Sequence, residues 1–379
     1  MKFTRRQFGK TSAASLVALA TPPIVGRALG DMPNVEVKDE LVVYTGTGLQ
    51  TNVMDELQEP FADFMQKKYG VAVRTQNVAG QIPASWVRLE TEWPNPSGDV
   101  YQLYNEHIIE GSQKGFFLPL RTAYTDEEWG RIDAGALADM GTGDYVEPIS
   151  ISAAVLIVQD DVTDEIDSWS ALGDPKYKNR ITFNSALSVG SGYDMILAAA
   201  LTVGADYHTW FNGDDFNEEA AMPAFEECAR WARNALTMTQ GSGSITPLVR
   251  RKEFLISAWW WHNGEEEKLR GTPVRIVFPK EGCPASVNCG PVVSAKSQNP
   301  VAALEWVKFY HSEFADDLAV SLNQFNRVPK VGQQPNPNFK AFMEASKIAW
   351  STEFRSLTIG PTYNKQVLDL YNRVVVQGA

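Results

Sequence analysis

The sequence has few of the residues that enzymes most often use to bind metals or to attack a substrate. Its 379 residues include only four histidines and three cysteines. The cysteines do not have the spacing of zinc, haem or iron–sulfur ligands. Serine-hydrolase, zinc-protease and phosphate-loop motifs are absent, and Thr51 stands where a dinucleotide fingerprint starting at Gly46 needs its third glycine. These absences exclude the enzyme classes that short motifs identify, and we expect no cofactor.

A block of basic residues is also missing. Aspartate and glutamate outnumber lysine and arginine by 46 to 34, which gives a formal net charge of -12. Such a chain is poorly suited to the phosphate backbone of nucleic acids, so we expect no nucleic-acid partner. The acidity could gather a cationic ligand or simply keep the protein soluble, and the sequence leaves both interpretations open.

The apolar stretch near the N-terminus is too short to span a membrane, and Pro22 and Pro23 interrupt it. It follows a basic start, and Gly26 and Ala28 offer the small residues of a cleavage site. We therefore expect residues 1–30 to be a signal peptide rather than part of the fold.

The basic start also carries a more specific pattern. The stretch TRRQFGK resembles the twin-arginine export signal, although Gly9 stands where leucine is usual. The matching residues are Thr4, Arg5, Arg6, Phe8 and Lys10. No cysteine precedes Cys228, so a lipoprotein anchor at the cleavage site is not expected. The mature protein should be free in the periplasm.

Strand and helix patterns alternate along the rest of the chain. Residues 40–48 form an apolar run that ends in a Thr/Gly loop, and residues 52–70 repeat apolar side chains at helical spacing. Further strands are expected at 71–78, 98–107, 150–161, 180–184, 253–261 and 273–282, and further helices at 84–93, 188–204 and 218–236. Polar loops or turns are expected after the strands at 98–107 and 253–261. This alternation indicates two α/β lobes with parallel sheets.

Five segments, in order along the chain, carry a family resemblance. They are residues 41–73, 88–103, 168–201, 273–282 (PVRIVFPKEG) and 299–312 (NPVAALEWVKFYHS). The third contains SWSALGDPKYKNRITFN followed by a Ser/Gly helix start. Together they resemble the extracellular solute-binding proteins that serve ABC importers.

The resemblance implies a type 2 periplasmic binding fold of the α/β class. Two lobes, each a mostly parallel sheet flanked by helices, would close on a ligand held between them. Lobe one would combine residues 31–147 with 284–379, and lobe two would span 148–283. The nearest branches bind ferric iron, polyamines, thiamine or aminoalkylphosphonates. Ferric iron is disfavoured, because the iron-binding members share an adjacent tyrosine pair that this sequence lacks.

Ligands of open α/β sheets bind beyond the carboxyl ends of the strands, which gives a set of candidate residues. The candidate ligand-binding residues are Thr45, Thr47, Gly48, Gln102, Tyr104, Asn105, Gly190, Ser191, Gly192, Tyr193, Ser242, Ser244, Trp260, Trp261 and Asn263. No catalytic and no metal-binding residue is proposed.

Two of these segments suggest a chemistry. The loop around Ser191 opens a helix, whose free N–H groups favour an anionic group; it could equally be a glycine turn with a serine cap. Of the three consecutive tryptophans, Trp259 is expected in the core, because side chains alternate along a strand. Trp260 and Trp261 lie at the strand end, where they could stack on a ring or attract an ammonium group. Alternatively, all three pack internally.

These observations predict a monomeric periplasmic binding protein rather than an enzyme. It would deliver a small polar solute, such as an amine or an aminoalkylphosphonate, to an ABC permease of the inner membrane. The alternatives are an exported enzyme with an unrecognised site and a ligand receptor for a sensor. Cys283 and Cys289 could pair in an oxidising periplasm, or both could stay reduced.

The export signal gives the first testable prediction. Replacing Arg5 and Arg6 together with lysine should trap the precursor in the cytoplasm, because the pathway requires the arginine pair. Fractionation followed by immunoblotting measures the result. A normal periplasmic yield from the double variant would contradict the assignment.

Overall fold

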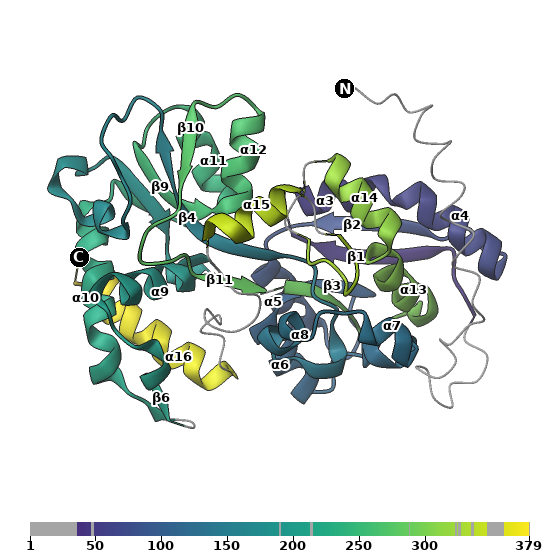
Figure 1. Cartoon of the computed structure of the whole chain (residues 1–379). Helices are drawn as coiled ribbons and strands as arrows, with labels where there is room; N and C mark the ends of the chain where they lie inside the picture. The colour runs from purple at the N-terminus through teal and green to yellow at the C-terminus, as the bar shows by residue number, and fades with distance from the viewer. Residues whose placement is uncertain are drawn as a thin grey trace.

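The computed structural model describes residues 36–46, 49–188, 191–212, 215–287, 289–322, 324, 327–334, 337–346 and 360–378. The expected signal peptide and the candidate residues Thr47, Gly48 and Gly190 lie outside these residues. The described part of the chain folds into two α/β lobes (Figure 1). None of its helices combines the length and the apolar composition needed to cross a membrane.

The first lobe is built on a four-stranded sheet with the order β12-β3-β1-β2. Its strands are β1 (Glu40–Thr45), β2 (Arg74–Ala79), β3 (Val100–Tyr104) and β12 (Cys289–Val293). β1 runs parallel to β2 and β3, and β12 runs antiparallel to β3. The three parallel strands therefore end at one edge of the sheet, as the strand–helix alternation predicts.

Helices cover this sheet and enclose its core. They are α3 (Leu49–Glu56), α4 (Gln58–Tyr69), α5 (Ile82–Glu92), α6 (Asn105–Gln113), α7 (Asp126–Gly130), α8 (Ala134–Met140), α13 (Pro300–Tyr310) and α14 (Glu313–Ser321), with the short turns η2 (Leu120–Ala123) and η3 (Gly143–Tyr145). The helix expected at 52–70 is divided into α3 and α4 near Leu57. Pro60 explains the division, because it has no N–H to donate to the preceding turn. Gly70 ends α4 in a left-handed conformation (φ 76°).

The second lobe contains a mixed sheet with the order β10-β4-β9-β5-β8. Its strands are β4 (Ile151–Gln159), β5 (Ile181–Asn184), β8 (Thr237–Thr239), β9 (Ile256–Trp260) and β10 (Val274–Val277), and β6 (Phe211–Asn212) and β7 (Asp215–Phe216) form a separate pair. The other elements are α9 (Ser191–Val203), α10 (Glu218–Asn234), α11 (Ser242–Arg250), α12 (Trp261–Leu269), η4 (Trp169–Gly173), η5 (Pro175–Tyr177), η6 (Ala186–Ser188) and η7 (Tyr207–Thr209). β5 is parallel to β8 and β9, whereas β4 is antiparallel to its neighbours.

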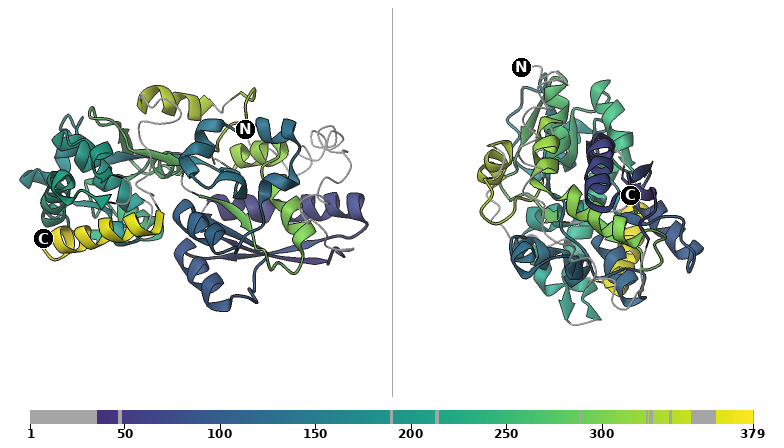
Figure 2. Two further views of the ribbon diagram at one scale, coloured as in Figure 1. Left: turned by 90° about the horizontal axis from the view of Figure 1, so that it is seen from below. Right: turned by 90° about the vertical axis from the view of Figure 1, so that its right-hand side faces the viewer.

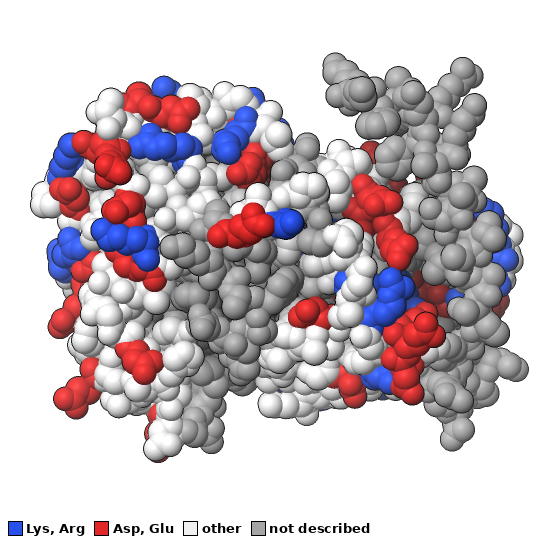
Figure 3. Space-filling view, viewed as in Figure 1, with Lys and Arg blue, Asp and Glu red and all other residues white. Residues whose placement is uncertain are grey.

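Two antiparallel strands connect the lobes. Every residue of β4 is buried, and its start pairs with β11 (Ala285–Val287), through Ala153 opposite Ala285. β11 leads directly into β12 of the first sheet. The chain therefore crosses from the first lobe at β4 and returns at β11, with the two crossings hydrogen-bonded side by side. On the face shown in Figure 3, acidic and basic side chains are interspersed over both lobes.

The end of the chain departs from the expected lobe assignment. After α15 (Pro337–Ser346), helix α16 (Gly360–Tyr371) and the π-helical turn η8 (Asn372–Val376) pack on α10. Val367, Leu370 and Val375 are buried in the same hydrophobic cluster as α9 and α10. This last segment thus contributes to the core of lobe two, while α16 also contacts α6 of lobe one. Figure 2 shows this last helix in yellow beside the elements of lobe two. An amphipathic pattern predicts that a helix covers an apolar surface, but it does not say which one.

A buried carboxylate joins the first sheet to the segment that returns to it. Asp99 precedes β3 and accepts hydrogen bonds from the backbone N–H of Val42 (2.9 Å) and from three groups of residues 297–299. The Asn299 amide in turn donates to the carbonyls of Lys38 and Glu40, at 2.9 Å each. The carboxylate therefore fixes the edge of β1 against the start of α13.

This network gives a stability prediction. Asp99→Ala should lower the free energy of unfolding by roughly 3 kcal/mol, because it leaves several buried N–H groups without an acceptor. Urea denaturation should show a lower midpoint with an unchanged slope. The exposed Asp63 of α4 provides a matched control, and Asp63→Ala should leave the midpoint nearly unchanged. Equal midpoints for the two variants would contradict the role of Asp99.

Candidate functional site

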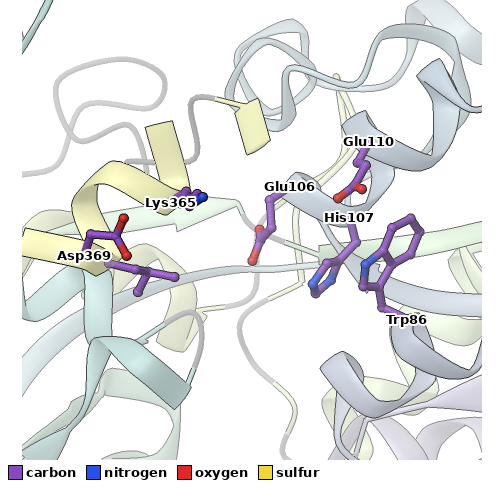
Figure 4. A pocket seen from close by; sticks show the side chains of 7 residues that line it. Trp86, Glu106, His107, Glu110, Lys365 and Asp369 are labelled. Carbon is purple, nitrogen blue, oxygen red and sulfur yellow. The ribbon is translucent and has the colours of Figure 1, made fainter. Parts of the chain in front are cut away.

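A cavity of about 330 Å³ lies between helices of the two lobes (Figure 4). One wall comes from α5 and α6 of the first lobe, and the other comes from α16, which packs on the second lobe. The lining residues are Trp86, Glu106, His107, Glu110, Lys365, Leu368 and Asp369. A volume near the lower end of the usual range suits a small ligand.

Glu106 is the most deeply buried charged group of this cavity. β3 passes directly into α6, with Tyr104 in an extended conformation as the N-cap and the Asn105 side chain accepting from the Glu106 N–H (3.2 Å). The Glu106 residue is only 7% exposed. Burial raises the pKa of its carboxyl to about 7, and no Lys, Arg or His among the described residues forms an ion pair with it.

Asp194 occupies the equivalent place on the second lobe. It lies in the first turn of α9 and is 2% exposed. Its carboxylate accepts a hydrogen bond from the indole N–H of Trp260 at 2.9 Å. Burial raises its pKa to about 7, the indole bond opposes that shift, and within the described residues no cation pairs with it.

Two tyrosines closely precede these carboxylates in the sequence. Burial raises the pKa of Tyr104, and the charges of Cys289, Glu106 and Asp194 add to the effect. Burial also raises the pKa of Tyr193, and the charge of Glu106 contributes. The buried Tyr193 hydroxyl has no hydrogen-bond partner among the described residues. The first turns of α6 and α9 thus bring acidic and phenolic groups together at the boundary between the lobes.

Two neutral histidines flank this region. Burial lowers the pKa of His107 to about 4. The His107 ring stacks on Trp86, with 5.4 Å between the ring centroids. Its buried Nδ1 has no hydrogen-bond partner among the described residues. Burial lowers the pKa of His262 to about 4 as well, and its Nδ1 is 2.8 Å from the Ser152 hydroxyl. Neutral rings add no positive charge, so neither histidine compensates the carboxylates.

Several residues expected to bind ligand support the strand ends instead. The Thr45 hydroxyl and the Gly46 N–H both donate to the side-chain oxygen of Gln102, at 2.8 and 2.9 Å. The Gln102 amide nitrogen lies 3.7 Å from the Cys289 sulfur, which joins β1, β3 and β12. Thr45, Gln102 and Asn105 are buried, so their first role is to hold the edge of the sheet.

Gly192 also has a packing role. A Cβ at this position would lie 2.2 Å from the Cα of Ala186, so only glycine allows the first turn of α9 to approach η6. Ser191 begins α9 and Ser242 begins α11. The exposed Ser244 hydroxyl donates to the Gly241 carbonyl at 2.8 Å, which is a contact within its own turn.

The three tryptophans have different environments. Trp259 is buried in the core, as the strand alternation predicts. Trp260 is partly exposed and is tied to Asp194. Trp261 begins α12 and is 2% exposed within a hydrophobic cluster, so it is not among the residues that line the cavity. Asn263 lies in the same helix.

The cysteines form no disulfide. Cys228, Cys283 and Cys289 are all buried thiols in the structure, so the pairing of Cys283 with Cys289 considered above is absent. Cys283 lies in the hydrophobic cluster before β11, whereas Cys289 begins β12 near Gln102. The two side chains therefore belong to different surroundings.

Sequence reasoning missed the residues that carry charge into the site. Glu106 and Asp194 directly follow the candidates Asn105 and Tyr193 in the sequence. The expected polar loop after β3 is helix α6, and the expected polar turn after β9 is helix α12. Lys365, Leu368 and Asp369 belong to α16, in the segment that the sequence places in lobe one. An acidic residue in the first turn of a helix is the signal that could have identified the first two.

Comparison with known proteins identifies the family. No curated protein matches the sequence, but the model of the bacterial extracellular solute-binding proteins matches residues 60–315. The periplasmic binding protein P5PA has a TM-score of 0.70 at 18% identity, over 89% of this chain and 100% of its own. AfuA from Actinobacillus pleuropneumoniae, with exogenous fructose-6-phosphate bound, has a TM-score of 0.69 at 18% identity, over 89% and 99%. The Atu4243-GABA receptor has a TM-score of 0.66 at 14% identity, over 90% and 98%.

These solved structures confirm the expected two-lobed α/β fold. The family match extends over more than half of the chain and includes the second sheet and strands β2, β3 and β12 of the first. The chain therefore belongs to the bacterial extracellular solute-binding proteins, which serve ABC transporters.

Proposed function

We propose that the protein binds a small solute with an ammonium group between its lobes and delivers it to the permease of an ABC importer. The observation that carries this proposal is the burial of Glu106 and Asp194, one on each lobe, without a cation among the described residues. An unpaired buried carboxylate costs several kcal/mol, and a bound cation would remove much of that cost.

The helix ends favour a cation over an anion at this place. A free helix N-terminus attracts anions, but the first turns of α6 and α9 already carry Glu106 and Asp194. A second negative charge there would be repelled. We therefore place the ammonium group of the ligand at these carboxylates, rather than an anionic group at the start of α9.

The neutral groups of the site support the same ligand. The Tyr193 hydroxyl and His107 Nδ1 are buried polar atoms without hydrogen-bond partners in the part of the chain that the structure describes, and both can accept a hydrogen bond from an ammonium group. The stacked rings of Trp86 and His107 provide an aromatic wall, on which a cation gains roughly 0.5–2 kcal/mol. Among the similar structures, the receptor whose printed name includes GABA binds a ligand with an ammonium group.

Removing the Glu106 charge tests the site. Glu106→Gln should weaken binding of an amine by about 30-fold or more, because it removes one partner of a buried charge pair worth at least about 2 kcal/mol. Isothermal titration with a panel of diamines and amino acids measures the loss. Glu59, also in the first turn of a helix but exposed, provides the control, and Glu59→Gln should bind like the wild type.

The stability of the empty protein separates a binding role from a structural one. A carboxyl with a raised pKa stabilises the fold at low pH, and this stability is lost as pH rises through about 7. At pH above that value, Glu106→Gln should therefore unfold at the same or a higher temperature than the wild type without ligand. A variant that both binds normally and melts earlier would contradict the assigned role.

Binding should also depend on pH. Because the pKa values of Glu106 and Asp194 are about 7 in the empty protein, an amine must displace a proton below that pH. Affinity should rise as pH increases from about 5 to 8 and then level off, since an alkylamine keeps its charge up to about pH 10. Titrations in two buffers of different ionisation enthalpy should show proton release. Proton uptake, or a flat profile, would exclude the carboxylates as the cation site.

A further inference from the structure

Helix α16 presents two different faces. Val367, Leu370 and Tyr371 are buried against the second lobe, and Arg373, just beyond the helix, pairs with Glu218 of α10 at 2.6 Å. The other face, with Lys365, Leu368 and Asp369 at i, i+3 and i+4, lines the cavity opposite α6. The helix is therefore fixed to lobe two while its second face forms a wall of the site.

Lys365 brings a positive charge to this wall. Figure 4 shows Lys365 beside α16, on the opposite wall of the cavity from Glu106. No ion pair joins Lys365 to the other residues that the structure describes, including Asp369 one turn further along the helix. Lys365 is exposed at the cavity edge, so its ammonium group is accessible to a ligand.

Two further carboxylates line the cavity. Glu110 pairs with Lys114 at the C-cap of α6, and the same ammonium group also pairs with Glu90. Asp369 is exposed to solvent, as Lys365 is, so solvent screens the fields of both side chains. What remains is an acidic end at the buried Glu106, an apolar surface at Leu368 and a basic group at Lys365.

We propose that Lys365 is a specificity-determining residue that binds an anionic group at the far end of the ligand, whose ammonium group lies at Glu106. The inference rests on the proposed function, and it narrows the ligand class to ω-zwitterions: a short chain with an amine at one end and a carboxylate or phosphonate at the other. Such a ligand would lie between α6 and α16, in contact with both walls of the cavity.

The residue lies outside the part of the chain that defines the family. The family model ends at residue 315, whereas α16 spans Gly360–Tyr371. Lys365 would therefore give this chain a selectivity that the family match alone does not assign.

Charge reversal at Lys365 tests the proposal with ligands of matched length. Isothermal titration compares a series of ω-amino acids with the diamines of the same chain lengths. The wild type should bind the best amino acid more tightly than the matching diamine. Lys365→Glu should lower the affinity for the amino acid about tenfold and raise the affinity for the diamine about tenfold, because the charge at the far end of the site changes from positive to negative.

Controls keep the outcomes separate. Lys340 is an exposed lysine of helix α15, and Lys340→Glu, which makes the same change in net charge, should leave the ratio of the two affinities unchanged. If Lys365→Glu does not fold, Lys365→Met should still lower the affinity for the amino acid more than that for the diamine.

Two results would overturn the inference, and they differ in what else they affect. If the wild type binds amines in a Glu106-dependent way but the Lys365 variants keep the same ratio, only the role of Lys365 fails. If the wild type binds none of the ligands, the proposed function fails and this inference fails with it.

Discussion

The burial of two carboxylates that no cation among the described residues pairs with is the constraint on which the site depends. Glu106 and Asp194 lie on opposite lobes, each in the first turn of a helix that follows the sheet edge. The helix dipoles offset part of the cost of burying them, but a dipole is worth only about 0.3–2 kcal/mol. The empty protein must therefore hold protons on these groups or keep them hydrated. A ligand with a positive charge would pair with these two carboxylates and lower the cost of burying them.

The surrounding structure keeps these carboxylates in place. Gln102 ties the ends of β1 and β12 to β3, so the strand that leads into Glu106 has little freedom to move. Gly192 allows the first turn of α9 to approach η6, and the indole of Trp260 fixes Asp194 from the neighbouring strand. These contacts are internal to each lobe. The lobes themselves are joined by the paired strands β4 and β11, and one hydrophobic cluster includes residues of both lobes, such as Tyr101 of β3 and Trp259 of β9.

The sequence predicts the sheets better than it predicts the site. The buried strands and the helix α10 follow from their hydrophobic periodicity, which is a local property. Helices α6 and α12 are not predicted, because each begins directly after the last residue of a strand and is rich in polar side chains. Gly264 inside α12 favours a turn when only the sequence is considered. In the structure, a Cβ at this position would lie 2.7 Å from the side chain of Ile157, so the packing leaves little room for a larger residue. The position of Lys365 depends on which lobe α16 covers, and no local pattern contains that information.

The position of α16 at the end of the chain also has a consequence for the order of synthesis. The strands of both sheets are complete once residue 293 has been made, and each lobe then contains most of its core. One wall of the cavity, however, comes from residues 365–369. A nascent chain could thus form both sheets while the cavity remains open on one side. The ability to select a ligand arises only after α16 has left the ribosome and packed on lobe two.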